Sequence, residues 1–495
     1  MRLSKPTAAL VAAGLALPAF AASDAAALQK LVERMEKLEA RNAELEKEVK
    51  SLRNESEQIS RGLESERISQ YEPELTSRLK ATEKDVLDMK KPSGIARALD
   101  GIKVSAGVAT VAQKALGFPS GVTYGDSQLN YRGDIAVELP LQPIGNVEQK
   151  LFAHVRVGQG LGLNPAFTGL GYFGATPNAV AFRASGANPD DSVLILGEAW
   201  YQAAIPLPFG GFRPDSRETL ELTFGKMDIF GFFDQNTAAG DESRQFLNSV
   251  FVHNPLLDAG GEVAVDANGF QPGFIAAYVN DTNKAEPWKV SLGFFGAGEL
   301  GASYQKSFDS PLAMLQAEKR LRLFGGLPGN YRAYAWHRSD VPEWDGTRSA
   351  THTGVGFSVD QRVGDGITLF GRYGKLTKGQ LPFDQALSAG AEINGSYWGR
   401  GGDTIGVGGS WLRASHEYRQ PGFASGCLSR DSDDNCTGAF NYNASGAEKI
   451  AEIYYRYRIS PQFDLTPDFQ WIGRPGANPG ADSVKVISLR ANVAF

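Results

Sequence analysis

Hydrophobic and polar residues alternate with a period of two along the last segment of the chain. Ile487, Leu489 and Val493 alternate there with Ser488, Arg490 and Asn492. Successive side chains of a strand point to opposite faces, so this pattern predicts a strand with one apolar and one polar face. The same alternation recurs upstream, in residues 129–139, 151–157, 355–362, 367–373, 453–459 and 463–471. Residues 101–495 are therefore predicted to be all-β.

Two architectures share this alternation. In a soluble sandwich the apolar faces enclose a core, whereas in an outer-membrane barrel they meet lipid and the polar faces line a lumen. The strands here are about ten residues long, which is the length that crosses a bilayer at a tilt, and aromatic residues lie near their ends. At roughly 22 to 25 residues per strand and connection, residues 101–495 supply about 16 strands, with 18 as the alternative. We therefore expect an antiparallel transmembrane β-barrel of about 16 strands with a water-filled channel.

The first 21 residues have the pattern of a secretory signal peptide. Arg2 and Lys5 precede an apolar stretch over residues 8–17, and small residues stand at Ala19 and Ala21. The apolar stretch is too short to span a membrane, and it predicts cleavage after Ala21. The chain is therefore expected to be exported.

Residues 24–70 carry a heptad pattern. Their a and d positions step alternately by three and four residues: Leu28, Leu31, Met35, Leu38, Asn42, Leu45, Val49, Leu52, Ser56, Ile59 and Leu63. This spacing is typical of a coiled coil, and the facing e and g residues are of opposite charge in a parallel assembly. A lone amphipathic helix on the barrel is the alternative. We expect residues 22–95 to form a periplasmic coiled-coil segment and the protein to be a homotrimer, although the pattern does not separate dimer from trimer.

The proportion of charged residues also changes near residue 100. Residues 22–100 contain 32 charged side chains among 79 residues, whereas residues 101–495 contain 72 among 395. The mean hydropathy of −0.26 excludes a bundle of membrane helices. The net charge is −6 and no basic stripe stands out, so a nucleic-acid partner is not expected.

The two cysteines near position 430 suggest a loop that is closed by a disulfide bond and contains several acidic residues. Cys427 and Cys436 are the only cysteines of the chain, and in an exported protein they are expected to form a disulfide. Asp431, Asp433 and Asp434 lie between them. They suit either a solvated loop or a calcium site, but the pattern lacks the glycine and glutamate of an EF-hand. We assign no metal site.

No catalytic chemistry stands out. The five histidines lack a zinc-ligand spacing, and the chain has neither a GxSxG elbow nor a phosphate-binding loop of the Walker type. We therefore expect neither an enzyme nor a bound cofactor.

Several motifs occur in an order that resembles the carbohydrate-selective porin family of Gram-negative outer membranes. They are Leu-Thr-Phe-Gly-Lys-Met-Asp at 222–228, Phe-Asp-Gln-Asn at 233–236, Phe-Leu-Asn at 246–248, His-Asn-Pro at 253–255, Tyr-Trp-Gly-Arg at 397–400 and Thr-Pro-Asp-Phe-Gln at 466–470. The resemblance covers most of residues 101–495. It implies a 16-stranded barrel that passes monosaccharides and other small sugars by passive diffusion. The N-terminal coiled coil departs from the plainest members of that family.

Side chains that could select a sugar are expected at a constriction. Aromatic faces stack on a sugar ring, while charged and amide groups bond to its hydroxyls. The candidates are Arg156, Glu198, Trp200, Asp234, Asn236, Glu242, Arg244, Arg332, Trp336, Arg456 and Arg458. The alternative for the two tryptophans is an interfacial position facing lipid, and the alternative for Arg156, Arg456 and Arg458 is a structural ion pair in the lumen. The long segments 161–191 and 228–258 either fold into the lumen or form surface loops.

Together these features predict a channel in the outer membrane for carbohydrates and similar small solutes, with lipid around it and permeating sugars as its partners. A general or anion-preferring porin is the first alternative. In the second, the barrel is an anchor and the coiled coil tethers the membrane to peptidoglycan. The sequence does not identify the solute, the pore radius or the loop that narrows the pore.

Overall fold

The computed structural model describes residue 47 and residues 101–117, 126–164, 176–182, 191–212, 216–258, 270–296, 308–342, 349–379, 381–420 and 443–495. The compact unit that holds the sheet begins at Gly101. The predicted signal peptide, the coiled coil and the Cys427–Cys436 disulfide lie outside the described residues and stay predictions.

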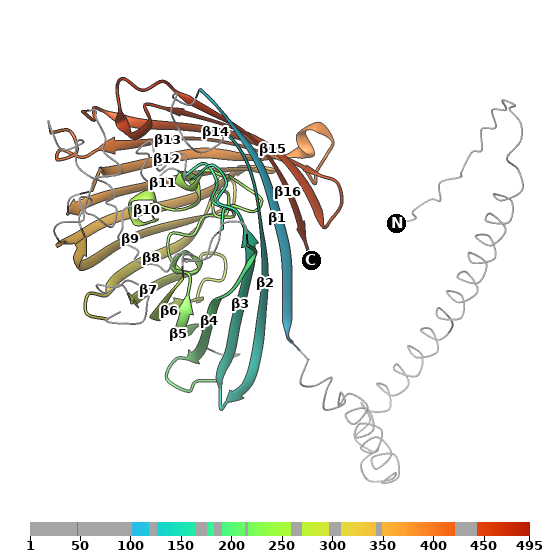
Figure 1. Ribbon diagram of the computed structural model, residues 1–495. Coiled ribbons are helices and arrows are strands. Elements are labelled where there is room, and N and C mark those ends of the chain that lie inside the picture. The colour runs from blue at the N-terminus through green and yellow to red at the C-terminus, as the bar shows by residue number, and fades with distance from the viewer. Residues whose placement is uncertain are drawn as a thin grey trace, which may run out of the picture. The chain divides into compact units, whose positions relative to one another are not determined.

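The strands close into one antiparallel barrel, with each strand paired to its neighbours in the chain and β1 paired to β16 (Figure 1). Their bounds are β1 (Lys103–Leu116), β2 (Ser127–Ile144), β3 (Val147–Gln159), β4 (Val193–Pro206), β5 (Glu218–Met227), β6 (Gln271–Asn280), β7 (Trp288–Phe295), β8 (Leu312–Leu323), β9 (Leu327–Pro342), β10 (Ser349–Gly364), β11 (Ile367–Lys378), β12 (Phe383–Asn394), β13 (Thr404–Ala414), β14 (Ala447–Arg458), β15 (Phe463–Gly473) and β16 (Val484–Ala494). The predicted 16-stranded barrel is confirmed. Among the described residues, no helix combines the length and the apolar character that crossing a bilayer requires.

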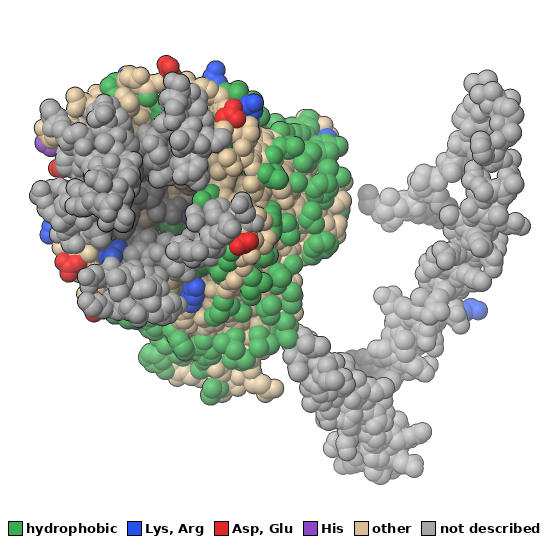
Figure 2. Space-filling model, in the orientation of Figure 1, with side chains coloured by type: hydrophobic (Ala, Val, Ile, Leu, Met, Phe, Trp, Pro, Cys, Tyr) green, Lys and Arg blue, Asp and Glu red, His purple; other side chains and the backbone are tan. Residues whose placement is uncertain are grey.

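The two faces of the strands differ as the alternation predicts. Leu129 and Ile487 point outward and are exposed, whereas Asn130 and Ser488, next to them in the chain, point inward and are buried. Figure 2 shows apolar side chains gathered over the outer wall. Apolar groups outside and polar groups inside are the reverse of a soluble sandwich, and they suit a wall that meets lipid.

The two ends of the barrel have connections of different length. At one end the strands are joined by tight turns, such as Gly364 to Ile367 between β10 and β11. At the other end the connections are long, and the one from β5 to β6 runs over residues 228–270. Short turns face the periplasm and long loops face the exterior in barrels of this kind. The C-terminal Phe495 lies at the short-turn end, because its backbone pairs with Ala106 at the start of β1.

The connection between β5 and β6 folds into the barrel (Figure 1). We call its described part, residues 228–258, the constriction loop. It contains the short helices η1 (Ile229–Gly231), α6 (Ser249–Val252) and α7 (Pro255–Asp258), and Asn248 caps α6 by accepting a hydrogen bond from the backbone N–H of Val250. Most of its apolar side chains, such as Phe233, Phe246 and Phe251, are buried. Of the two positions expected for this segment, the lumen and the surface, the structure shows the lumen.

Candidate solute path through the barrel

A buried carboxylate fixes the first half of the constriction loop. Asp234 is 1% exposed, and its Oδ1 accepts hydrogen bonds from Arg372 Nε of β11 at 2.9 Å and from the Tyr334 hydroxyl of β9 at 2.8 Å. Its Oδ2 accepts from the backbone N–H of Asn254 at 2.7 Å. A buried ion pair needs such additional hydrogen bonds to offset the loss of water. Asp234 therefore joins two strands and the far end of its own loop.

Two side chains of the wall hold the backbone of the second half. The carboxyl group of Glu452 on β14 accepts hydrogen bonds from the backbone N–H groups of Leu247 and Asn248, at 2.6 and 2.9 Å. The guanidinium of Arg490 on β16 donates to the carbonyls of Glu242 and Gln245, both at 2.7 Å. These bonds fix the loop tip, residues 241–245, near the wall formed by β16 and β1.

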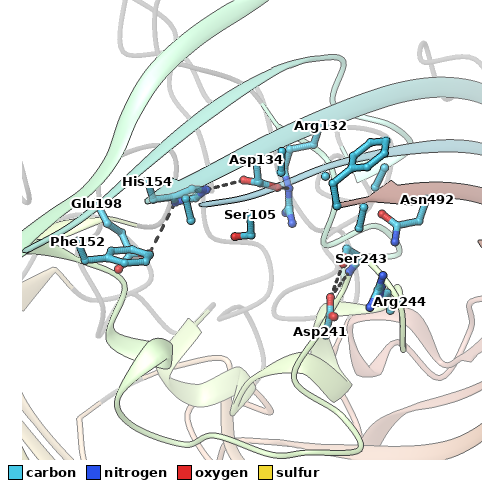
Figure 3. A pocket seen from close by; sticks show the side chains of 16 residues that line it. Ser105, Arg132, Asp134, Phe152, His154, Glu198, Asp241, Ser243, Arg244 and Asn492 are labelled. Carbon is cyan, nitrogen blue, oxygen red and sulfur yellow. Dashed lines mark hydrogen bonds and ion pairs between the residues drawn. The ribbon is translucent and has the colours of Figure 1, made fainter. Parts of the chain in front are cut away.

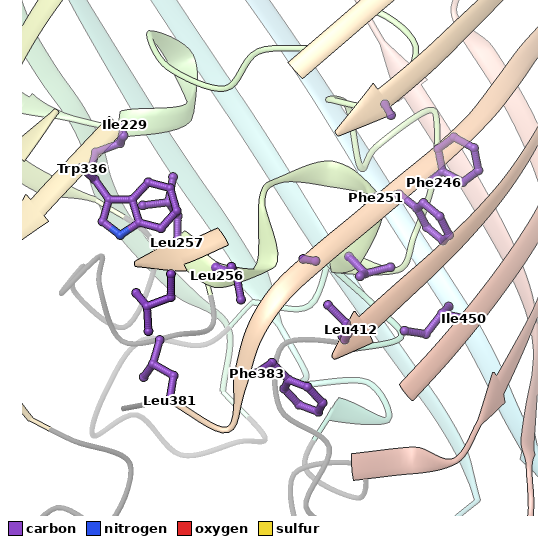
Figure 4. Packing of buried hydrophobic residues seen from close by; sticks show 14 of the residues in the cluster. Ile229, Phe246, Phe251, Leu256, Leu257, Trp336, Leu381, Phe383, Leu412 and Ile450 are labelled. Carbon is purple, nitrogen blue, oxygen red and sulfur yellow. The ribbon is translucent and has the colours of Figure 1, made fainter. Parts of the chain in front are cut away.

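Apolar packing fills the lumen on one side of the loop. Phe246 and Phe251 of the loop contact Phe370 of β11, and the same buried cluster contains Trp336 of β9 and Leu412 of β13 (Figure 4). Burying side chains of this size contributes roughly 1.5–3 kcal/mol each. The side of the lumen along β9–β13 is therefore filled by protein, and open space remains on the opposite side.

A second inward segment, residues 176–182 between β3 and β4, packs on the constriction loop. The backbone N–H of Ala179 donates to the Leu247 carbonyl at 2.7 Å, and Asn178 Nδ2 donates to Asn130 Oδ1 of β2 at 2.7 Å. Gln470 of β15 donates to the Pro177 carbonyl at 2.9 Å. The described part of the predicted loop 161–191 thus also narrows the lumen.

A cavity of about 610 Å³ lies between the loop tip and the wall of β1–β4 and β16 (Figure 3). Its polar and aromatic lining consists of Ser105, Arg132, Asp134, Phe152, His154, Glu198, Asp241, Ser243, Arg244, Asn492 and Phe495. Because Ser105 and Phe495 belong to the short-turn end, the cavity extends toward that end of the barrel.

Charged side chains of the cavity are paired with one another. Asp134 accepts from Arg132 Nε at 2.8 Å, from Arg156 Nε at 2.7 Å and from His154 Nε2 at 2.8 Å. Arg132 also reaches across to the loop, with its Nη2 2.8 Å from Glu242 Oε1. The network therefore connects the wall to the constriction loop and leaves neither Arg132 nor Arg156 without a carboxylate partner.

An aromatic pair lies next to this network. The rings of Phe152 and Trp200 are stacked with centroids 4.8 Å apart, and Trp200 Nε1 donates to Glu198 Oε2 at 3.2 Å. Figure 3 shows Phe152 and Glu198 close together beside His154. A ring face next to carboxylate, guanidinium and amide groups is the combination that binds a sugar by stacking and hydrogen bonds.

Comparison with known families decides the class of channel. The profile described as "Carbohydrate-selective porin, OprB family" matches residues 132–495. The chain belongs to this family. The family and the closed barrel indicate an outer-membrane protein that forms a porin channel for carbohydrates.

One solved porin structure shares the fold of this chain, and further solved structures match it less closely. OprB of Pseudomonas putida, in its high-pH structure, is 18% identical, and the match covers 81% of this chain and 96% of that chain with a TM-score of 0.61. The low-pH structure of the same protein is 13% identical over 84% of this chain and 96% of that chain, with a TM-score of 0.44. A mutant of the Rh. blastica porin is 11% identical over 80% of this chain and 100% of that chain, with a TM-score of 0.43. Comparison with curated protein sequences gives no match.

The structure brings together five of the side chains proposed from the sequence. Arg156, Glu198, Glu242 and Arg244 lie at or beside the cavity, and Trp200 lies behind Phe152. Arg244 Nε is 3.7 Å from Asp464 Oδ2 of β15. Trp200 points into the barrel, so the alternative of a lipid-facing residue does not apply to it.

The other candidates lie elsewhere. Asp234 and Asn236 are buried contacts between loop and wall, and Trp336, 1% exposed, belongs to the apolar cluster rather than to the channel lining or the lipid face. Arg332 is buried on β9 between Glu318 and Asp360. Arg456 donates to Thr404, and Arg458, the last residue of β14, donates to the Pro461 carbonyl of the turn that follows. These positions remove Asp234, Asn236, Arg332 and Trp336 from the set of solute contacts.

Most of the cavity lining was absent from the sequence candidates, including the three charged or polar side chains Arg132, Asp134 and His154 of β2 and β3. They occupy the polar faces of residues 129–139 and 151–157, which the alternation identifies. The alternation along these two strands therefore predicts that all three side chains point into the barrel. What it could not supply was the position of the loop tip, which decides where along each strand the constriction lies.

Two loop carboxyls have shifted pKa values in opposite directions. Burial acts to raise the pKa of Glu242, but the guanidinium groups of Arg132 and Arg156 outweigh it and lower the pKa below its ordinary value. Burial raises the pKa of Asp228, which follows β5 directly. Glu242 is therefore a charged member of the constriction. No cluster of potential metal ligands occurs in the part of the chain that the structure describes.

Proposed function

We propose that small neutral sugars diffuse through this porin along the cavity between the constriction loop tip and the wall of β1–β4 and β16. The observation that carries the proposal is the placing of Phe152 beside Arg132, Asp134 and Glu198 in one cavity of about 610 Å³. A volume of this size suits a small molecule. Passive transport needs several weak contacts rather than one strong site, so that the solute also leaves.

Charge pairing favours neutral solutes over anions. Both Arg132 and Arg156 contact Asp134, and Arg132 also contacts Glu242. An anion would have to compete with these carboxylates, whereas a sugar hydroxyl donates to a carboxylate or accepts from a guanidinium without breaking the pairs. The anion-preferring alternative is therefore the weaker one for this constriction.

Liposome swelling with sugars of increasing size tests the proposal. We expect rapid swelling with monosaccharides, slower swelling with longer sugars, and little discrimination between chloride and potassium in reversal potentials. Equal swelling for sugars and for neutral solutes without hydroxyl groups of the same size would contradict sugar recognition. A strong anion preference would support the general porin instead.

We propose further that residues 22–95 join three chains in a homotrimer in the periplasm. The support is the heptad pattern with its oppositely charged e and g positions. Mass measurement by light scattering in detergent, on the full mature chain and on a variant lacking residues 22–95, tests this. A full chain that is monomeric would contradict it. Pull-down of peptidoglycan by the full chain but not by the shortened one would support the tether as an additional role.

A further inference from the structure

The outer face of the barrel carries a row of cations at the long-loop end. Lys114 of β1, Lys485 of β16, Lys449 of β14, Arg413 of β13 and Lys375 of β11 each lie within four residues of that end of their strand. We call these five residues the basic rim. Their neighbours in sequence, such as Val484 and Val486 or Leu412 and Ala414, are buried inside the barrel. Strand alternation therefore points the five cations outward, toward lipid.

The strand register brings the rim residues close together. Lys114 pairs with Ile487, two residues from Lys485, which makes the two lysines diagonal neighbours about 7–8 Å apart. Lys485 stands directly opposite Trp471, and Lys449 stands directly opposite Trp411. The rim therefore joins lysines and tryptophans on the outward faces of consecutive strands. This is the composition of a membrane interface that meets charged headgroups.

Most of the positive charge of the rim is unpaired. Arg413 Nη2 lies 2.6 Å from Asp384 Oδ2. Within the described part of the chain, no ion pair involves Lys114, Lys375, Lys449 or Lys485, and all four are exposed. Four lysines held on one surface without counter-charges repel one another, so this surface favours an anionic partner.

The short-turn end of the barrel carries fewer outward-facing lysines on its described strands than the long-loop end. Among the described strands, the outward faces at the short-turn end carry a single lysine, Lys319, which stands beside Trp288 and Tyr331 in the register. Below the rim the outward positions are apolar and exposed, as at Ile453, Phe469 and Ile487. A ligand with several negative charges at its head and acyl chains beneath fits the rim, and it belongs to the leaflet that the long loops face.

We propose that the basic rim binds the phosphate groups of an anionic glycolipid of the outer leaflet, with its acyl chains against the apolar strands below. The chemistry is that of lipid A, which carries two phosphates on a sugar head. The inference depends on the outer-membrane placement of the barrel and not on which solute it passes.

Native mass spectrometry of the full mature chain in detergent micelles doped with lipid A tests the proposal. Each lysine near an anionic surface is worth about 1 kcal/mol, or roughly a fivefold change in affinity. The double variant Lys449→Gln/Lys485→Gln should therefore retain roughly 25-fold less lipid A than the unsubstituted chain. Lys449→Arg/Lys485→Arg should restore binding, and Lys319→Gln, at the other end, should leave it unchanged. Heat-modifiable mobility on gels reports that each barrel is folded.

Three outcomes would overturn the proposal. Equal retention of lipid A by all variants would remove the rim from lipid binding. Equal retention of phosphatidylglycerol and lipid A by the unsubstituted chain would replace the glycolipid with any anionic lipid. A change in oligomeric mass in the glutamine variant, with lipid A retention unchanged, would make the rim a contact between copies of the chain.

Discussion

Arg372 of β11 places its Nε 2.9 Å from Oδ1 of Asp234, and both side chains are almost wholly removed from solvent. The same guanidinium donates to the carbonyls of Asp234, Ala239 and Phe251. One arginine of the wall therefore binds the constriction loop at four places. The shape of the channel depends on this contact, because the loop lies where it does only while it is attached to the wall.

Removing the charge of Asp234 is expected to destabilise the barrel strongly. Asp234→Asn leaves the Arg372 guanidinium buried without its carboxylate, which costs about 3–5 kcal/mol of unfolding free energy. The matched control is Asp365→Asn, whose carboxylate is exposed at a turn and pairs with Arg362 at the surface, so its loss costs under about 1 kcal/mol. Urea unfolding in detergent, followed by tryptophan fluorescence, compares the two. Similar costs for both variants would contradict the role of Asp234.

Neutralising Glu242 is expected to make the channel prefer anions. Glu242→Gln removes the loop carboxylate that faces Arg132 across the cavity and leaves the charge of Arg132 compensated by Asp134 alone. Reversal potentials in a salt gradient should shift toward chloride, and the shift should shrink at high salt. Glu286→Gln, in the exposed turn between β6 and β7, is the control and should leave the potential unchanged.

The same carboxylate predicts the response to acid. Because the pKa of Glu242 is lowered in the folded protein, its contribution to stability is fully present above the ordinary carboxyl pKa, near 4.3. That contribution is lost as the pH falls through the lowered value. We expect the ion selectivity of the unsubstituted channel to stay constant from pH 7 to about pH 4.5 and to move toward chloride below that. A shift already complete at pH 6 would contradict this assignment.

Phe152 is expected to contribute the stacking surface for the sugar. Phe152→Ala removes the ring that lines the cavity, and loss of one aromatic face costs about 1.4 kcal/mol of sugar affinity, so we expect roughly a tenfold loss. Sugar-dependent block of the ion current measures it. Phe357→Ala removes a ring of the same size from the exposed outer face of β10 and should not change the block. Equal effects of both substitutions would place sugar recognition elsewhere.

Replacing a glycine that lies opposite an inward aromatic ring is expected to disturb the packing of that ring. Gly356 of β10 pairs with Tyr334 of β9, and a Cβ at Gly356 would overlap with that ring. Gly356→Ala should therefore displace Tyr334, which donates to Asp234, and cost about 1–3 kcal/mol. Gly371 has open space where a Cβ would lie, so Gly371→Ala should be nearly neutral. Equal unfolding free energies for the two variants would show that the ring moves freely.

Local pattern was enough to predict the barrel wall. Each strand buries one face and exposes the other, so Arg490 and Asn492 inside and Ile487 and Leu489 outside follow from parity alone. Strand number followed from length, because a spanning strand and its connection need a nearly constant number of residues.

The inside of the barrel could not be predicted in the same way. The alternation along the strands predicts that Trp336 and Glu198 both point into the barrel. Trp336 is nevertheless buried in an apolar core, whereas Glu198 faces the cavity. What separates them is the constriction loop, whose position depends on contacts such as Arg372 with Asp234 and Arg490 with Glu242, between residues far apart in the chain. No periodicity encodes such contacts.

Thiol modification during single-channel recording tests most directly where the solute path lies. Ser243 lines the cavity at the loop tip, whereas Ser388 of β12 is buried between the loop and the wall. A charged methanethiosulfonate reagent should react rapidly with Ser243→Cys and lower its conductance and sugar flux, and it should leave Ser388→Cys unchanged. Blockage of Ser388→Cys with no effect on Ser243→Cys would place the open path on the opposite side of the constriction loop and contradict the account.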